Sequence, residues 1–384
     1  MRLTLNALDP RQARRLWLRA QRLDELAPFG GGPQATRRAV EHLGYVQIDT
    51  IHVVERSHHQ ILYTRIPAYR RAHLHQAQSV DKTVFEYWTH ALSYVPTRDL
   101  RFFMRSMRRD WRARSAWFGT VKEAELRKVL ARIRRHGALT IRDIDDDILV
   151  EKDHAWASRK PSKRALQLAF YRGLVTVSLR TGMLKTYELM PRHFGWERPP
   201  RAATEAEILN YLLDRALRTQ ALVNPDSVSY LDAGRKPAIR RLIETRVRHG
   251  ELVQASVEGV LHCIRPQSLE TKLADSDLVH ILSPFDPLVH QRARLRLFFD
   301  YEHRFEAYVP REKRKFGYFA QPVLVGDEIA AVLDLKTDRV ARRLLIQQWT
   351  WIARAARREK KRRIEEALHR FERFQLAEGP SVRI

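Results

Sequence analysis

The sequence has little cysteine, few acidic residues and no long apolar run, and each shortage excludes a class of protein. Its 384 residues include a single cysteine, Cys263, which excludes disulfide bonds, a cysteine-ligated iron–sulfur cluster and a cysteine-based zinc site. A chain with one thiol fits a reducing compartment. Neither the first stretch, MRLTLNALDPRQARRLW, nor any later one has the apolar length of a secretory signal or a membrane span. We therefore expect a soluble, cytoplasmic protein.

The shortage of acidic residues leaves a strongly basic chain. Lysine and arginine number 70 against 45 aspartates and glutamates, which gives a formal net charge of +25 at pH 7. Most of the basic residues are arginine, whose planar fork matches a phosphate group. This excess favours a polyanionic partner, above all nucleic acid. The alternative is a basic protein from an arginine-rich proteome.

One order of predicted elements occurs more than once along the chain. Apolar spacing and capping signals predict a helix over 121–137, a short helix opened by Thr140, a basic helix over 160–174 and a hairpin over 175–189. The same order follows as a helix over 204–220, a short helix opened by Asn224, a basic helix over 235–252 and a hairpin over 253–266. Three helices and a hairpin are the plan of a winged helix-turn-helix. However, other helix–helix–helix–hairpin units look alike, and many winged helices never touch DNA.

The two ends of the chain complete the predicted fold. Asp9 and Pro10 open a first helix, a glycine-rich loop follows, and residues 34–44 form the third, basic helix, which leaves 44–65 as the wing. After residue 266, short alternating runs predict a small antiparallel β-barrel, and residues 351–377 predict a basic amphipathic helix. We therefore predict an α+β fold with three winged helix-turn-helix units and a barrel-like domain with a closing helix, over residues 1–118, 119–198, 199–265 and 266–384.

The stretch GYVQIDTIHVVERSHHQILYTR, residues 44–65, is the candidate for chemistry. Read as a strand, it places Gln47 and Asp49 on one face, about 7 Å apart at the backbone, and the neighbouring apolar residues on the other. At that spacing both polar groups reach one water or sugar. A carboxylate can deprotonate water or stabilise a positive centre while an amide holds the water, which suits hydrolysis through an oxocarbenium-like state. The alternative is the wet face of an amphipathic strand.

Other motifs with known chemistry are weak or absent. The adjacent His58 and His59 are more often surface hydrogen-bonding groups than catalysts, and His73 and His75 have no partner at a familiar metal-site spacing. The sequence has no Walker-type phosphate loop and no zinc-deaminase motif. We expect neither a metal nor a cofactor.

Four stretches, in this order, resemble one family over nearly the whole chain. They are GYVQIDTIHVVERSHHQILYTRIPAY, VFEYWTHALSYVP, LSPFDPLVHQRAR and YEHRFEAYVPREKRKFGYFAQPVL, and they resemble the winged-helix DNA glycosylases of the YcaQ/AlkZ type. The resemblance implies three winged helix-turn-helix units, a small β-barrel, excision of N7-alkylguanines and unhooking of interstrand crosslinks. The family's motif of glutamine, an aliphatic residue, and glutamine or aspartate falls on Gln47, Ile48 and Asp49. The aspartate form resembles the YcaQ branch, associated with broader alkylguanine substrates, rather than the branch dedicated to one antibiotic's crosslinks.

The resemblance also implies a mechanism. An N7-alkylated guanine is cationic and leaves without being protonated, so the reaction needs no general acid. Asp49 would stabilise the cationic sugar or activate water, and Gln47 would orient that water. Because the motif has no lysine for a Schiff base, we expect a monofunctional glycosylase that leaves abasic sites. A crosslinked base is too bulky for a closed pocket, so we expect an open cleft.

Double-stranded DNA with alkylated or crosslinked guanine is the expected partner, bound by a monomer and placing the protein at the nucleoid. The candidate DNA-binding residues lie beside the motif and at the starts of the two later basic helices: Arg56, His58, His59, Arg65, Lys160, Lys163, Arg164, Arg235 and Lys236. Helix starts also offer N–H groups to phosphates. If about six phosphates are neutralised, log affinity falls with log salt at a slope of about −5.

Two other functions fit part of the sequence. A non-enzymatic winged-helix DNA-binding regulator would explain the charge and the repeats, and it would prefer one DNA sequence strongly over others. It leaves the polar pair and the β domain without a role. A nuclease would use clustered carboxylates for two metal ions, and no such cluster stands out in the stretches discussed above.

Overall fold

A computed structural model describes residues 5–109, 117–144, 149, 158–271, 273 and 275–377. The chain forms two units. Unit 1 comprises Met1–Arg71, Thr89–Ser93 and Leu209–Ser381, and unit 2 comprises Ala72–Trp88, Tyr94–Ile208 and Val382–Ile384. Small sheets and helices together make the predicted α+β fold. The four-segment division at residues 118, 198 and 265 stays a prediction.

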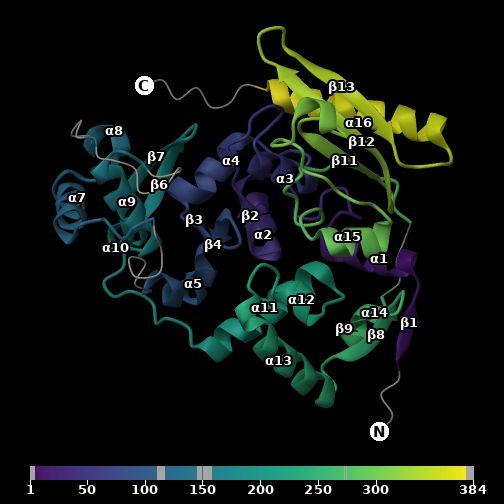
Figure 1. Ribbon diagram of the computed structural model, residues 1–384, viewed down its shortest axis with the longest axis horizontal. Coiled ribbons are helices and arrows are strands. Elements are labelled where there is room, and N and C mark those ends of the chain that lie inside the picture. Colours follow the sequence, from purple (N-terminus) through teal and green to yellow (C-terminus); the bar gives the residue numbers. More distant parts are fainter. Residues whose placement is uncertain are drawn as a thin grey trace. The chain divides into compact units, whose positions relative to one another are not determined.

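Unit 1 contains most of the helices and the largest sheet (Figure 1). Its described α-helices are α1 (Pro10–Ala20), α2 (Gly32–Leu43), α3 (Ser57–Arg65), α11 (Glu205–Gln220, from Leu209 onward), α12 (Pro225–Val228), α13 (Lys236–Arg248), α14 (Pro266–Leu269), α15 (Arg292–Phe299) and α16 (Arg357–Leu376), and 3-10 turns lie at Ala233–Arg235 and Arg311–Lys313. Its strands are β1 (Asn6–Leu8), β2 (Val46–Gln47), β8 (Val253–Val257), β9 (Val260–Ile264), β10 (Val279–Ile281), β11 (Ala320–Val325), β12 (Glu328–Asp338) and β13 (Arg343–Trp351). Among the described helices of the chain, none combines the length and the apolar character needed to cross a bilayer.

Unit 2 is smaller. Its described helices are α4 (Arg71–His75, from Ala72), a π-helical turn (Gln76–Val80), a 3-10 turn (Thr97–Asp99), α5 (Leu100–Met107), α7 (Glu123–His136), α8 (Ile141–Ile144), α9 (Pro161–Tyr171) and α10 (Met190–Phe194). Its strands are β3 (Val84–Trp88), β4 (Leu92–Pro96, from Tyr94), β5 (Leu139–Thr140), β6 (Val175–Thr181) and β7 (Leu184–Leu189).

The element order predicted over 121–189 is confirmed in unit 2. α7 is followed by Gly137, whose φ of 89° favours glycine. Before α8, the N–H and the hydroxyl of Thr140 both donate to Asp143 Oδ2 at 2.7 Å. α9 then precedes the hairpin of β6 and β7, which turns at Gly182, and β5 joins the edge of β7.

The order predicted over 204–266 is also confirmed. α11, α12 and α13 precede the hairpin of β8 and β9, and Asn224 caps α12 by accepting the Ser227 N–H at 2.9 Å. The sequence did not indicate the partner of this hairpin. β1 pairs parallel with β8, with Asn6 opposite Ala255, which gives a three-stranded sheet in the order β1-β8-β9.

The amino-terminal part departs from the predicted unit. α1 begins at a capping box formed by Asp9 and Gln12, and α2 begins close to the predicted start of the basic helix. Residues 21–31 between them form turns and bends where the sequence predicted a glycine-rich loop, so two helices precede β2 where the plan of a winged helix-turn-helix has three. The predicted wing is wrong as well, because β2 stops at Gln47 and residues 57–65 form α3.

The carboxy-terminal sheet is open, which corrects the predicted barrel. Its strands lie in the order β10-β11-β12-β13 with antiparallel neighbours, and the outer strands β10 and β13 do not pair with each other. α16 packs against β10, β11 and β13 and buries Ile364, Leu368 and Phe371 (Figure 1). In a closed barrel the apolar face of the sheet would be buried inside the barrel. Here α16 covers that face instead. α16 begins after β13, six residues later than the sequence predicted.

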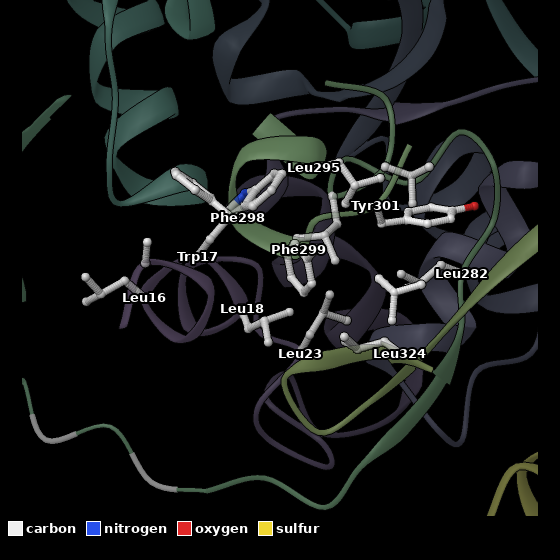
Figure 2. Packing of buried hydrophobic residues seen from close by; sticks show 14 of the residues in the cluster. Leu16, Trp17, Leu18, Leu23, Leu282, Leu295, Phe298, Phe299, Tyr301 and Leu324 are labelled. Carbon is white, nitrogen blue, oxygen red and sulfur yellow. The ribbon is translucent and has the colours of Figure 1, made fainter. Parts of the chain in front are cut away.

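A hydrophobic core joins α1 to α15 in unit 1 (Figure 2). Trp17 is 1% exposed and meets the Phe298 ring edge-on, with ring centroids 5.7 Å apart. The Arg294 guanidinium lies over the Trp17 ring, 4.6 Å from its centroid. Leu288 and Val289 are fully buried in the same cluster. The segment that leads to His290 is therefore anchored in the core.

Candidate active site

The residue that joins α2 to the candidate site is Gly44. α2 ends at Gly44, which has a left-handed φ of 77° and donates its N–H to the Val40 carbonyl at 2.8 Å. A Cβ at this position would lie 2.8 Å from Cγ of Arg215 on α11. Glycine is therefore required both by the backbone conformation and by the space available. The turn delivers Tyr45 and β2 directly after the helix.

Gln47 is fixed by two other segments of unit 1. Its side chain is buried, and its Oε1 lies 3.1 Å from Nε2 of His90. Its carbonyl oxygen accepts a hydrogen bond from the Ser57 hydroxyl at 2.9 Å. The next residue, Ile48, donates its N–H to the Leu92 carbonyl at 2.8 Å. Both ends of Gln47 are thus held, and the amide has a defined partner.

Asp49 follows in a loop and is half-buried. Its Oδ1 accepts the Ile51 N–H at 2.8 Å. Burial raises the pKa of the Asp49 carboxyl above its ordinary value, while hydrogen bonds from the backbone of Ile51 and Thr50 oppose that rise. Among the described residues, no cation contributes to this balance. Such a carboxyl is a better proton acceptor than an ordinary surface aspartate.

This arrangement differs from the predicted strand face. β2 contains only Val46 and Gln47, so Asp49 lies outside it. Val46, Gln47 and Ile48 are all buried, which means that burial does not alternate along the motif. The Ser57 hydroxyl and His90 hold Gln47, whereas the turn that Asp49 makes with Ile51 holds its carboxyl. The two polar groups are therefore positioned by separate contacts.

The sequence reasoning missed two histidines beside Gln47. His90 stacks on His290 with ring centroids 4.9 Å apart and planes 6° apart, and the Tyr45 hydroxyl lies 3.3 Å from Nε2 of His290. Burial and the nearby Arg215 lower the pKa of His90 to about 4. Burial and His90 lower the pKa of His290 to about 3. Both rings are therefore neutral at pH 7. A signal was available, because VFEYWTHALSYVP and LSPFDPLVHQRAR each contain one of these histidines.

A second polar group surrounds Glu55, just before α3. Glu55 is buried and accepts from Arg71 Nε at 3.0 Å, and His52 Nε2 lies 3.4 Å from its other oxygen. Burial raises the pKa of Glu55, but the hydrogen bond from His52 and the charge of Arg71 outweigh it and lower the pKa to about 2. Burial lowers the pKa of His59 to about 4, and its Nδ1 lies 2.7 Å from the Tyr69 hydroxyl. At pH 7 His59 is therefore a neutral hydrogen-bonding group rather than a cation for phosphate.

Arg65 is enclosed in unit 1, which corrects its assignment as a DNA contact. The side chains of Arg65 and Asp286 are both 0% exposed and form two hydrogen bonds, at 2.8 and 3.0 Å. Arg65 also donates to the carbonyl and the side chain of Gln21, at 3.0 and 2.9 Å. A guanidinium in this position cannot reach a phosphate. It supports the turn at Asp286, whose carbonyl accepts the His290 N–H at 3.1 Å.

Three predicted DNA-binding residues lie together at the start of α3. Arg56 and His59 are half-buried and His58 is buried, and the two imidazole rings have centroids 4.2 Å apart. Arg56 therefore remains the candidate cation beside the motif.

The other predicted DNA-binding residues lie on the later basic helices. In unit 2, Lys163 is exposed on α9 and Lys160 is half-buried, whereas Arg164 is buried and donates to the Thr120 hydroxyl. In unit 1, Arg235 and Lys236 are half-buried at the start of α13 and form ion pairs of 2.5 Å with the acidic side chains of Asp232 and Asp226. Of these five side chains, Lys163 has the most accessible charge.

The side chains at the site are suited to orienting a water molecule and to stabilising a positive charge. Unit 1 supplies a fixed amide, a carboxyl with a raised pKa and two neutral, stacked imidazoles. Among the residues that the structure describes, no group of three histidine, cysteine, aspartate or glutamate side chains is placed to bind a metal ion. A fixed amide can hold a water molecule, and a carboxyl of this kind can accept a proton or stabilise positive charge on a sugar.

Comparison with known proteins identifies relatives. The family model described as DNA glycosylase AlkZ-like matches residues 40–374. Among solved structures, the Streptomyces sahachiroi DNA glycosylase AlkZ has a similar fold, with a TM-score of 0.59 and 15% sequence identity over 96% of this chain and 97% of that chain. At this identity the structural likeness concerns the fold.

Proposed function

Because the chain belongs to the AlkZ-like family and is a DNA glycosylase, we propose that it hydrolyses the N-glycosidic bond of N7-alkylated guanines in double-stranded DNA. We include guanines in interstrand crosslinks, which it would unhook. The proposed enzyme acts as a monomer in the cytoplasm, at the nucleoid. The proposed fold contains winged helix-turn-helix units, supported by the repeated order of helices and hairpins.

The observation that carries the proposal is the environment of Asp49. Its carboxyl is half-buried, its pKa is raised by burial, and it belongs to the same short segment as the fixed amide of Gln47. A carboxyl kept mainly for stability would normally have a cation or several donors to satisfy it. The donors to Asp49 are the backbone N–H groups of Ile51 and Thr50, and no cation among the described residues pairs with it, which leaves capacity to accept a proton or face a cation.

The proposed reaction follows from the charge of the substrate. The bond between C1′ and N9 breaks, and its electron pair neutralises the cationic N7-alkylguanine. The deoxyribose becomes oxocarbenium-like, and the Asp49 carboxylate stabilises this positive charge. Water held by Gln47 then bonds to C1′ and gives its proton to Asp49. The products are the free alkylated base and an abasic site.

We propose no lyase step. The segment that carries Gln47 and Asp49 has no lysine to form a Schiff base with the sugar. The abasic product would therefore keep both flanking phosphodiester bonds until it is treated with alkali. An open cleft, needed for a crosslinked base, is part of the same proposal.

The proposed DNA contacts exclude Arg65 and rely on charges that remain accessible. Arg56, Lys160, Lys163, Arg235 and Lys236 are exposed or half-buried. His58 and Arg164 could contribute only after they move, because both are buried, and His59 could contribute a hydrogen bond but no charge, because it is neutral. Neutralisation of about six phosphates would make log affinity fall with log salt at a slope of about −5.

The alternative of a non-enzymatic regulator is not favoured. It would leave the raised pKa of Asp49 and the fixed amide of Gln47 without a purpose. A regulator also discriminates among DNA sequences by a factor of about 10³ or more, whereas a lesion enzyme binds most duplexes alike. Competition binding with unrelated duplexes separates the two.

The test measures base release directly. Purified protein in EDTA is incubated with a duplex that contains one N7-methylguanine, and alkali-labile sites are counted. We expect lesion-dependent sites with the wild type and strong loss in Gln47→Ala and Asp49→Asn. Duplex affinity should be retained in both variants, because neither residue is a proposed phosphate contact.

A matched control is Asp277→Asn, which alters a carboxylate that is also in unit 1 but paired with Arg363 at 3.3 Å. It should leave excision unchanged. No release from N7-methylguanine, from a bulkier N7 adduct or from a crosslinked duplex would refute the proposed substrate. Activity that EDTA abolishes would instead support the nuclease.

A further inference from the structure

We propose that His90 is a positioning residue for the reaction, because its Nε2–H holds Oε1 of Gln47 and so turns the amide NH2 of Gln47 toward the attacking water. This inference rests on the proposed function. It adds that, toward the attacking water, Gln47 is the hydrogen-bond donor and Asp49 is the acceptor.

The first step is the polarity of the contact between the two side chains. Oε1 of Gln47 can only accept, and it lies 3.1 Å from Nε2 of His90, so Nε2 carries the proton. Nδ1 of the neutral ring is then an acceptor. It lies 3.4 Å from the Thr89 hydroxyl, which also donates to the Ala91 carbonyl at 3.2 Å. The contact with Gln47 is therefore the one that assigns the Nε2–H tautomer.

The second step is that the His90 ring itself is held in place. Its plane is parallel to that of His290, at 6° and 4.9 Å between centroids, and the Tyr45 ring meets it edge-on at 5.1 Å. His290 is held in turn, because Tyr230 donates its hydroxyl to the His290 carbonyl at 2.9 Å. Buried Leu288 and Val289 anchor the same segment in the core. The hydrogen bond to Gln47 therefore comes from a fixed donor.

The third step is the charge state. Burial and Arg215 keep the pKa of His90 near 4, and burial together with His90 keeps the pKa of His290 near 3. Two neutral imidazoles stack without repulsion, whereas protonation of either would put a cation beside Arg215. Neutral rings also preserve the single tautomer, because a protonated ring would donate from both nitrogens.

The consequence concerns what Gln47 offers to the reaction. With Oε1 occupied, its free polar group is the NH2, which donates to a lone pair of water. Asp49 has oxygens that accept, with Ile51 N–H as donor to Oδ1. Water between them is therefore oriented by a donor on one side and an acceptor on the other. That orientation exposes its second lone pair to the cationic C1′.

The experiment compares single-turnover release of N7-methylguanine in a mutant cycle. His90→Phe keeps a flat ring in the stack and removes the donor, and we expect about 10- to 100-fold slower release with unchanged duplex affinity. His90→Gln places an amide N–H near the position of Nε2 and should restore part of the rate. In the Gln47→Ala background, His90→Phe should cause no further loss, because His90 acts through Gln47.

A second readout does not depend on activity. Nitrogen-15 NMR of the histidine rings reports the tautomer, and we expect the Nε2–H form of His90 at pH 7, with a changed Nε2 shift in Gln47→Ala. The exposed His369 on α16 offers a control, since His369→Phe should alter neither the rate nor the His90 signal. Thermal unfolding of each variant checks that the fold is intact.

The outcomes separate this inference from the proposed function. An Nδ1–H tautomer of His90, or multiplicative losses in the double variant, would overturn the positioning role even if the enzyme excises N7-methylguanine. Absence of excision by the wild type would refute the proposed substrate, while the NMR result would still decide whether His90 fixes the Gln47 amide.

Discussion

Replacing Arg65 by methionine removes the cation from a buried ion pair and leaves its partner in place. Arg65 donates to Asp286 at 2.8 and 3.0 Å, and both side chains are 0% exposed. In Arg65→Met the Asp286 carboxylate keeps one donor, the Leu288 N–H at 2.9 Å, and loses its counter-charge. The carbonyl of Gln21 loses a donor as well.

The size of the effect follows from this geometry. Removing one member of a buried, hydrogen-bonded ion pair costs about 3–5 kcal/mol, because the remaining charge is desolvated without compensation. A typical domain is stable by about 5–15 kcal/mol. With an m-value of about 2–3 kcal/mol per molar urea, the midpoint of unfolding should fall by about 1–2 M. Arg65→Lys keeps the positive charge but not the two-pronged guanidinium, and its free energy of unfolding should fall less than that of Arg65→Met.

Urea unfolding followed by fluorescence of Trp17 and the other tryptophans measures the loss. The double variant Arg65→Met/Asp286→Leu removes both charges and should be more stable than Arg65→Met alone. The salt dependence of duplex affinity should be unchanged in Arg65→Met/Asp286→Leu, whereas loss of a phosphate contact would reduce the slope by about 0.9. A midpoint shift below about 0.3 M, or a flatter salt slope, would refute the buried role of Arg65.

Two further predictions concern the same part of unit 1. Gly44→Ala should lower the free energy of unfolding by about 1–3 kcal/mol, because alanine is strained at φ 77° and its Cβ would displace Arg215. Urea unfolding measures this loss. Gly250→Ala is the control, because Gly250 has a similar φ of 74° but open space around it, so its free energy of unfolding should fall less. Acid should destabilise the protein, because the pKa values of His90 and His290, about 4 and about 3, lie below the ordinary value of 6.5. The stabilisation is therefore complete above pH 6.5 and is lost as the pH falls toward 4, with at most about 1.4 kcal/mol per pH unit for each ring and less after solvent screening. Urea midpoints at pH 7.5, 6 and 5 test this, and the slope should be shallower in His90→Phe; an equal slope would contradict it.

Local signals determined the elements that the sequence predicted well. Asp9 and Asn224 cap helices, and Gly137 and Gly182 occupy left-handed positions where helices and hairpins end. These features depend on a few neighbouring residues, whose backbone preferences act wherever the segment lies in the fold. The motif of Gln47 and Asp49 was also visible from neighbouring residues alone.

Long-range packing determined the features that the sequence predicted wrongly. The pattern of residues 44–65 is compatible with a strand, but β2 ends at Gln47, whose carbonyl accepts the hydroxyl of Ser57, the first residue of α3. The barrel prediction failed because α16 covers the sheet. The pairing of β1 with β8 joins segments about 250 residues apart, and no local pattern encodes such a partner.

By itself the sequence determined the charge, the order of most helices and hairpins, and the glutamine and aspartate on which the proposed chemistry depends. Only the tertiary structure decided which basic side chains keep an accessible charge and which are buried against hydrogen-bond or ion-pair partners. Arg65 and Lys163 are both basic helix residues that the sequence predicted as DNA contacts. In the structure Arg65 is buried against Asp286, whereas Lys163 is exposed. Only the structure brought His90 and His290 together beside Gln47. The physical reason is that burial and hydrogen-bond partners depend on segments far apart in the chain, whereas residue type fixes only which bonds a side chain can make.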